Sequence, residues 1–373
     1  MFSYAQWVPW VSSFLGAVTG FCLYVYIKNR FIFGLPESPA KIVISLLTLL
    51  LLSGGLAIAG YLDGLAAWLI MIFGICIIGE ALRIVRVRNL KIEDEESENR
   101  AGERAKWITT TELQVLRYRL PVAADWSRPL RIVHTSDWHF SPKLPHSYWQ
   151  RVVETLAQAE ADLLFLTGDF VTHARDARFI SEYLSRELAR LGTFAVLGNH
   201  DYWEQPDEIR SHLTSAGVTL LTNTSVLLDP LPGTPLLICG CDDPWGSESW
   251  QPPRAPYQCI KLCLSHTPDN IYRLSGWGAD AVFSGHFHAG HVRFPFLGAL
   301  LIPSAYGRRF VHGHFRVNQT HLYVSAGIGS VVPSQRILCP PDIMIIDLVP
   351  AHLTDDNIRV GEGIGREPVG DHR

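Results

Sequence analysis

The sequence predicts a membrane-anchored α/β protein, in which three apolar helices precede a layered α/β domain. Only 18% of the 373 residues are charged, whereas soluble domains carry about 25%. Three apolar segments, 7–27, 42–61 and 65–82, each approach the roughly 20 residues that span a bilayer. After residue 107, short apolar segments alternate with amphipathic ones, which is the order of strands and helices in a layered α/β fold.

The basic residues predict the orientation of this anchor. Lys28, Arg30 and Lys41 lie between the first two apolar segments, and Arg83 and Arg86 follow the third. Since basic residues stay on the cytoplasmic side, we expect a multi-pass inner-membrane protein with its N-terminus outside and its C-terminal domain in the cytoplasm. A cleaved signal peptide is disfavoured because no basic region precedes the first segment and two more apolar segments follow it.

Composition divides the chain into four parts: an anchor over 1–91, a charged linker over 92–106, a globular domain over 107–350 and a disordered tail over 351–373. The seven cysteines are odd in number and form no Cys-x-x-Cys pair, so neither a disulfide framework nor a thiolate zinc site is expected. The net charge of −4 does not favour a nucleic-acid partner.

The globular part is expected to contain two facing mixed sheets with helices outside. Its first half alternates strands at 130–135, 163–167 and 193–197 with apolar helical patterns over 149–156 and 179–191, which predicts a largely parallel sheet. Its second half is rich in expected strands, at 218–228, 236–240, 259–265, 281–284, 321–325 and 343–348, with one helix near 270–274.

Residues of the types that bind metals recur directly after these strands. They are Asp137, His139, Asp169, Asn199, His200, His266, His286 and His288. Ligand sites of open α/β sheets lie at the carboxyl ends of the strands, and residues i and i+2 of an extended segment point the same way. Carboxylate, imidazole and amide ligands together suit Mn²⁺, Fe or Zn²⁺. Any one of these residues alone is more often structural, but five such segments in order indicate a metal centre.

These five segments resemble the calcineurin-like metallophosphoesterase superfamily, whose pattern is D-x-H, G-D, G-N-H-D, H and G-H-x-H. The resemblance covers about 131–348. It implies an αββα sandwich that binds two divalent metal ions, with Mn²⁺ expected in preference to Fe or Zn²⁺. By resemblance, Asp137, His139 and His288 hold one ion, Asn199, His266 and His286 hold the other, and Asp169 bridges them. His200 is then the acid or transition-state stabiliser, and Asp201 orients it.

Further segments resemble the membrane-anchored bacterial branch called YkuE-like or YaeI-like. They are GHFHAGH at 285–291, Gly327-Ile328-Gly329 and Pro340-Pro341-Asp342. Phe287, Ala289 and His291 depart from the Thr, Gly and Gln of that branch. The resemblance implies hydrolysis of a phosphodiester or pyrophosphate at the cytoplasmic membrane surface. Some members of the superfamily cleave UDP-diacylglucosamine on the lipid A pathway.

Four further residues are candidates for binding the substrate. Arg293, Arg308 and Arg309 could bind a phosphate or a lipid headgroup, or could belong to a solvated loop. His291 could donate a hydrogen bond to the substrate, or take no part.

Two other functions stay open at this point. One is a broad phosphodiesterase acting on soluble substrates, with the anchor used only for location. The other is a membrane scaffold that has lost its activity, which the complete set of ligand residues disfavours.

Overall fold

The structure is a computed structural model that describes residues 4–27, 39–63, 92–93, 107–184, 188–246, 249–256, 258–294, 298–299, 302–331 and 334–353. The chain divides into two compact units, which are described separately. The first contains Met1–Lys91 and Leu300–Arg309, and the second contains Ile92–Ala299 and Phe310–Arg373. The predicted third apolar helix at 65–82, most of the predicted linker and nearly all of the predicted tail lie outside the described residues.

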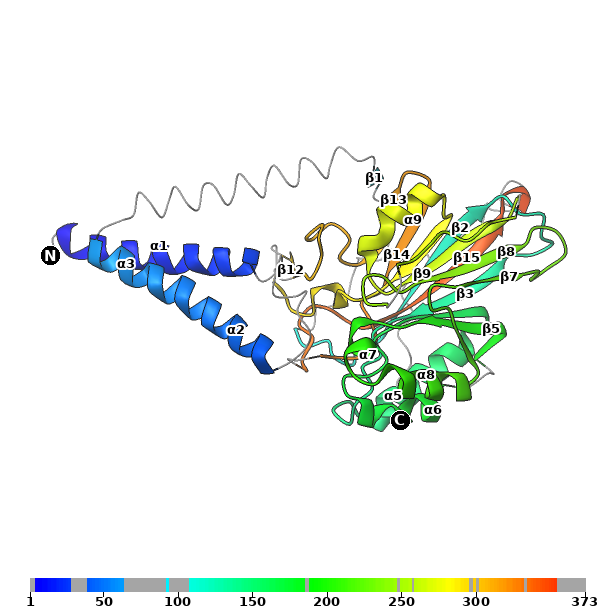
Figure 1. Cartoon of the computed structure of the whole chain (residues 1–373), viewed down its shortest axis with the longest axis horizontal. Coiled ribbons are helices and arrows are strands. Elements are labelled where there is room, and N and C mark those ends of the chain that lie inside the picture. The colour runs from blue at the N-terminus through cyan, green and yellow to red at the C-terminus, as the bar shows by residue number, and fades with distance from the viewer. Residues whose placement is uncertain are drawn as a thin grey trace. The chain divides into compact units, whose positions relative to one another are not determined.

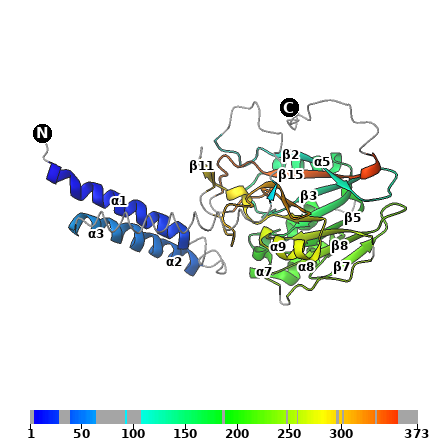
Figure 2. The ribbon, with the colours of Figure 1, turned by 90° about the horizontal axis from the view of Figure 1, so that it is seen from above.

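The first unit contains two helical stretches, and the second packs against the first mainly through its C-terminal half (Figure 2). One is α1, Tyr4–Ile27; the other consists of α2, Pro39–Leu49, a π-helical turn at Leu50–Gly54, and α3, Gly55–Asp63. Two glycines allow the close approach. A Cβ atom added at Gly16 would lie 2.2 Å from the Leu56 carbonyl oxygen, and one at Gly20 would lie 2.1 Å from that of Leu52.

The predicted membrane anchor is wrong for this part of the chain. Among the described residues, no helix combines the length and the apolar character needed to cross a bilayer. The second predicted span is divided by the π-helical turn into helices of 11 and 9 residues. The first is long enough at 24 residues, but Pro9, Ser12 and Ser13 lower its apolar character. This finding contradicts the three-helix anchor in the predicted fold class and the predicted inner-membrane location.

The second unit contains the predicted sandwich of two mixed sheets (Figure 1). In the described residues, one sheet has the strand order β2 (Gln114–Val122), β15 (Asp342–Pro350), β3 (Leu130–Thr135), β4 (Ala161–Thr167), β5 (Ala189–Val196) and β6 (Val218–Leu220). The other has the order β1 (Ile92–Glu93), β13 (Gly313–Val317), β14 (Thr320–Val324), β10 (Ala281–Ser284), β9 (Ile260–Ser265), β8 (Leu236–Cys241) and β7 (Ser225–Leu228). A small pair joins β11 (Arg293–Phe294) to β12 (Gly298–Ala299).

Helices cover the outer faces of the sandwich. The helices α5 (His146–Gln158), α6 (Arg178–Tyr183) and α8 (Pro206–Ser215) lie on the side of the six-stranded sheet, and α9 (Ile271–Trp277) lies on the other side (Figure 1). The short helix α7 spans Asn199–Trp203. Successive side chains of a buried strand point to opposite faces of the sheet and therefore belong to two hydrophobic cores. In β4, Leu164 and Leu166 face the helices, whereas Leu163 and Phe165 face the second sheet.

The parallel strands at the centre of each sheet bring their carboxyl ends together. In one sheet β3, β4 and β5 run parallel, with Phe165 paired to Phe194. In the other, β8, β9, β10 and β14 run parallel. Because five of these strands end directly before the predicted ligands, the fold gathers these residues at the edge where ligand sites of α/β sheets form.

Several predicted elements differ in extent from those observed. The expected strand 218–228 is two strands in different sheets, because the chain turns at Asn223, whose φ is 48°. The expected helix over 179–191 ends at Tyr183, and Ala189 already belongs to β5. The strands β2 and β13 were not anticipated from the sequence.

Asp162, at the start of β4, ties three neighbouring segments together. Its buried carboxylate accepts hydrogen bonds from both Nη atoms of Arg128 at 2.9 Å, from the Arg131 backbone N–H at 2.8 Å and from Nε of Arg190 at 2.9 Å. Burial alone would raise the pKa of Asp162, but these donors outweigh it and hold the pKa below its ordinary 3.8. The stabilisation is therefore complete above about pH 4 and is lost as the pH falls through the lower folded-state pKa.

We expect Asp162→Asn to lower the free energy of unfolding by about 1.5 kcal/mol at pH 7, because a charged acceptor of several hydrogen bonds is removed. The difference from the unchanged protein should shrink as the pH is lowered from 5 to 3. Urea unfolding at a series of pH values measures it. Asp207→Asn is the matched control, since the Asp207 side chain is 98% exposed and should matter little. If the two substitutions lowered the free energy of unfolding equally, the stabilising role assigned to the Asp162 carboxylate would be wrong.

Candidate metal centre

The loops after the strands hold their polar residues with an unusual backbone. Asp137, His139, Asp169, His286 and His288 all have φ between 42° and 70°, the left-handed region that residues with side chains rarely adopt. Backbone hydrogen bonds fix these conformations: Asp137 donates to the Gly168 carbonyl at 2.9 Å and His139 to that of Asp169 at 2.9 Å. Strain that surrounding contacts maintain is typical of functional sites.

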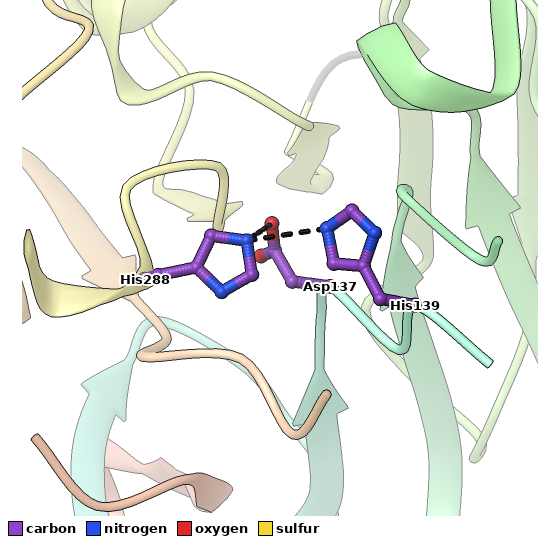
Figure 3. A group of neighbouring side chains, drawn as sticks. All are labelled: Asp137, His139 and His288. Carbon is purple, nitrogen blue, oxygen red and sulfur yellow. Dashed lines mark hydrogen bonds and ion pairs between the residues drawn. The ribbon is translucent and has the colours of Figure 1, made fainter. Parts of the chain in front are cut away.

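The first donor group comprises Asp137, His139 and His288. All three are buried, and their ligand atoms lie within 4.8 Å of one another. Nε2 of His288 is 3.2 Å from Oδ1 of Asp137 and 3.2 Å from Nε2 of His139 (Figure 3). Asp137 and His139 follow β3, whereas His288 follows β10, so both sheets contribute to this group.

The second donor group comprises Asp169, His266 and His286, whose ligand atoms also lie within 4.8 Å of one another. Nε2 of His266 is 3.1 Å from Nδ1 of His286 and 3.1 Å from Oδ1 of Asn199. Nδ1 of His266 donates to the Thr167 carbonyl at 2.6 Å. That bond fixes the ring so that Nε2 faces the other donors, which is how outer hydrogen bonds orient histidine ligands.

Asp169 joins the two groups. Its Oδ2 lies 3.4 Å from Nε2 of His139 in the first group and 3.4 Å from Nε2 of His266 in the second. Its Oδ1 accepts the backbone N–H of His200 at 2.9 Å. One carboxylate oxygen is therefore placed between donors of both groups.

The donors themselves suit divalent cations. Oδ1 of Asp137 is fully buried, and Nε2 of His288 lies 3.2 Å from it; a buried carboxylate needs such a partner, or a cation, to offset the loss of its solvation. Paired imidazole nitrogens 3.1–3.2 Å apart can share one proton or together bind a cation. The His/Asp groups could therefore hold metal ions, with nitrogen and oxygen donors of the kind that Mn²⁺, Fe and Zn²⁺ accept.

The charges of the second donor group interact strongly. Burial alone would lower the pKa of His266, but the Asp169 carboxylate outweighs it and raises the pKa to about 9. Burial lowers the pKa of His286 to about 3, and the charge of His266 adds to this effect. In the free protein His266 is therefore an imidazolium at neutral pH, with one N–H on Nδ1 and an additional one on Nε2, and a bound cation would displace the proton on Nε2.

His200 and Asp201 lie beside these groups in different ways. The half-buried ring of His200 packs against the rings of His139 and Trp203, with centroids 4.7 and 5.1 Å away. Its ligand atom also falls within 4.8 Å of those of His139 and Asp169. The carboxylate of Asp201 is fully buried and accepts the backbone N–H groups of Gly198 at 2.9 Å and Asp169 at 2.8 Å. Asp201 thus positions the two loops, and its predicted action on His200 stays a prediction.

The predicted substrate residues are divided between the two compact units, with His291 and Arg293 in the second and Arg308 and Arg309 in the first. His291 is buried beside the first donor group, its ring centroid 5.6 Å from that of His288. Arg293 lies in β11, where its backbone N–H donates to the Ile337 carbonyl at 3.0 Å. A role in substrate binding stays a prediction for all four.

Other residues at the site were not among the predicted catalytic, metal-binding or substrate-binding residues. Trp245 covers the second group, with ring centroids 5.5 Å from His266 and 5.1 Å from His286. Asp242, buried directly after β8, accepts a hydrogen bond from the Tyr202 hydroxyl at 2.5 Å. A carboxylate directly after an apolar strand is the same signal that singled out Asp169, and it could have drawn attention to Asp242. Arg336 reaches His288 from a distant part of the sequence.

Comparison with known proteins agrees with this geometry. The family model of the calcineurin-like phosphoesterases matches residues 130–290, a range that includes both donor groups. Phosphodiesterase YaeI of Escherichia coli is 30% identical over 243 residues, which cover 63% of this chain and 88% of the relative.

Two further relatives are similar over comparable lengths. The uncharacterized metallophosphoesterase YkuE of Bacillus subtilis is 26% identical, with 65% of this chain and 85% of the relative covered. The UDP-2,3-diacylglucosamine pyrophosphatase LpxG of Chlamydia muridarum is 26% identical, with 62% and 87% covered. The strand order, the paired donor groups and these matches agree, and the chain belongs to the calcineurin-like phosphoesterase family.

Proposed function

We propose that this phosphoesterase is a dinuclear enzyme that uses two divalent cations to hydrolyse a phosphodiester or pyrophosphate bond. Mn²⁺ is the cation that we propose first, with Fe and Zn²⁺ as alternatives. The observation that carries the proposal is the position of Asp169, whose Oδ2 lies 3.4 Å from a histidine of each donor group. Asp137, His139 and His288 would hold one cation, Asn199, His266 and His286 the other, and Asp169 would contact both.

The protein's own residues prepare this site for an anionic substrate. When bound, two such cations supply positive charge that offsets the phosphate oxygens and makes water a stronger nucleophile. Thr167 and Asp201 fix the directions of His266 and of the Asp169 backbone before any ligand arrives. Such preorganised groups need little rearrangement during the reaction.

We assign to His200 the role of stabilising the leaving group. Burial lowers the pKa of His200 to about 3 in the free protein, so its ring is neutral at pH 7 and donates a single N–H. A neutral imidazole N–H can hydrogen bond to the developing negative charge on the leaving oxygen. Its half-buried ring, unlike the buried ring of His139 beside it, retains access to solvent and substrate.

The relatives suggest two substrate classes. The name of YaeI denotes a phosphodiesterase, and that of LpxG denotes a pyrophosphatase of UDP-2,3-diacylglucosamine. We propose a lipid-linked pyrophosphate or phosphodiester of this kind as the substrate, with a broad phosphodiesterase of soluble substrates as the alternative. An inactive scaffold is disfavoured because it would not need two joined donor groups.

One experiment separates these alternatives. Purified full-length protein is assayed with Mn²⁺ on UDP-diacylglucosamine and on a soluble bis-aryl phosphodiester, each with an EDTA control. A strong preference for the lipid-linked substrate supports the first class, and activity on the soluble ester alone supports the second. If neither is hydrolysed and metal analysis finds no bound cation, the dinuclear proposal is wrong.

Replacing His200 by Ala should slow turnover by about 10²–10⁴-fold while the metal content stays close to that of the unchanged protein. The reduction should be largest for esters with poor leaving groups, because these depend most on a hydrogen-bond donor. A series of aryl phosphodiesters of different leaving-group pKa, together with metal analysis, measures both effects. Loss of one metal equivalent would instead make His200 a ligand, in line with its proximity to His139 and Asp169.

A further inference from the structure

We propose that Arg336 is a positioning residue for the first donor group, holding the ring of His288 and the turn that supports Asp137 with a single guanidinium group. The proposal rests on the dinuclear function above. It concerns a residue that lies far along the chain from most of the donors and touches no substrate.

Arg336 is completely buried, yet its charge is met by backbone dipoles. Its Nη1 donates to the Ala326 carbonyl at 2.8 Å, and its Nε donates to that of Gly329 at 2.9 Å. Its Nη2 donates to Gly327 at 2.9 Å and again to Gly329 at 2.6 Å. A buried cation requires such compensation. The guanidinium group therefore fixes the turn 326–329 from inside.

That turn packs directly against Asp137. The Gly329 backbone N–H donates to the Asp137 carbonyl at 2.7 Å, and that of Ile328 donates to Ser136 at 3.0 Å. A Cβ atom added at Gly327, where φ is 75°, would lie only 2.6 Å from Cβ of Asp137. Any displacement of the turn is thus transmitted to the carboxylate of the first donor group.

The same guanidinium group reaches the other side of this group. Nη2 of Arg336 lies 3.3 Å from Nδ1 of His288, whose opposite nitrogen, Nε2, faces Asp137 and His139. Cys339, three residues after Arg336, donates its thiol to the His288 carbonyl at 2.8 Å. Both the ring and the backbone of His288 are therefore held by the segment 336–339.

The shape of the guanidinium group matters here as well as its charge. Its donors diverge in one plane toward three carbonyls and one imidazole, which a lysine ammonium cannot reproduce. Outer contacts to metal-binding histidines typically change metal affinity by 10–100-fold. We expect two Mn²⁺ ions to bind to the unchanged protein. Arg336→Met and Arg336→Lys should each lower the binding affinity for one of them by at least about tenfold and leave the affinity for the other nearly unchanged.

Equilibrium dialysis of the full chain against Mn²⁺ alone tests this directly. His266→Ala removes a donor of the second group, so this variant should retain only the Mn²⁺ ion bound by the first group. The affinity for that ion is the one that substitutions of Arg336 should lower. Arg131→Met is the control for general destabilisation, because Arg131 bonds to Asp347 at 2.8 Å on the six-stranded sheet and should change the unfolding midpoint without changing Mn²⁺ affinity.

The outcomes distinguish this proposal from the proposed function. If the unchanged protein binds no Mn²⁺ or a single equivalent, the dinuclear function fails whatever the variants do. If it binds two and Arg336→Lys keeps both affinities, Arg336 has no positioning role. Should Arg336→Met not fold, Arg336→Lys and Cys339→Ala still decide, since Cys339→Ala removes one contact of the His288 backbone and should weaken the same equivalent.

Discussion

Replacing Asp169 by Asn is expected to reduce turnover by about three orders of magnitude. Its Oδ2 lies 3.4 Å from a histidine of each donor group, so the substitution removes a negative charge from both at once. Cations at such sites contribute several kcal/mol to the transition state, and a loss of about 4 kcal/mol corresponds to about a thousandfold in rate. Steady-state turnover with saturating Mn²⁺, with metal content measured on the same sample, provides the test.

Asp125→Asn is the control for this substitution, because Asp125 is exposed and lies in a loop of the same domain. It should leave turnover and metal content unchanged. If Asp169→Asn turns over at the rate of the unchanged protein, the assignment of both metal positions is wrong.

The substitution Gly198→Ala is expected to disrupt the site without changing any charge. A Cβ atom there would lie 2.1 Å from Oδ1 of Asp169 and 2.5 Å from its backbone nitrogen. Since the nitrogen cannot move without the loop, we expect a loss of about 3 kcal/mol in the free energy of unfolding. Displacing Asp169 by even 1 Å should lower turnover by about a hundredfold. Urea unfolding and turnover assays measure the two effects.

Gly276→Ala is the matched control for the added methyl group. Gly276 lies in α9, and nothing is within 4 Å of the position its Cβ would take. A gain of about 0.5 kcal/mol in the free energy of unfolding is expected there, since alanine restricts the unfolded chain more than glycine does. A neutral result at Gly198 would show that the loops can separate and that their packing does not fix Asp169.

Local sequence patterns were sufficient for the central strands. The strand Ala281–Ser284 was predicted with the observed bounds because both of its faces are buried and every residue in it is apolar or small. The residues expected to meet at the strand ends do so, since parallel pairing places those ends side by side. The D-x-H and G-H-x-H spacings could therefore be interpreted without knowledge of the whole fold.

Features that depend on distant partners could not be predicted in this way. The strand β2 mixes apolar residues with Arg117 and Arg119, and it is recognisable as a strand mainly through its pairing with β15, more than 200 residues later. Arg336 has no motif of its own, and its contacts with His288 exist only in the folded chain. The first two predicted membrane helices, which lie in the described residues, failed because counting apolar residues overlooked an internal proline in one and a π-helical turn in the other.

Each donor group draws on both layers of the sandwich, with Asp137, His139 and Asp169 from one sheet and His266, His286 and His288 from the other. Bound cations would thus act as cross-links between the sheets, and cation supply would be linked to resistance against heat and proteolysis. Each tenfold excess of free cation over its dissociation constant would add about 1.4 kcal/mol per position. A cell that withholds the cation would therefore hold a phosphoesterase that is idle and also more easily degraded.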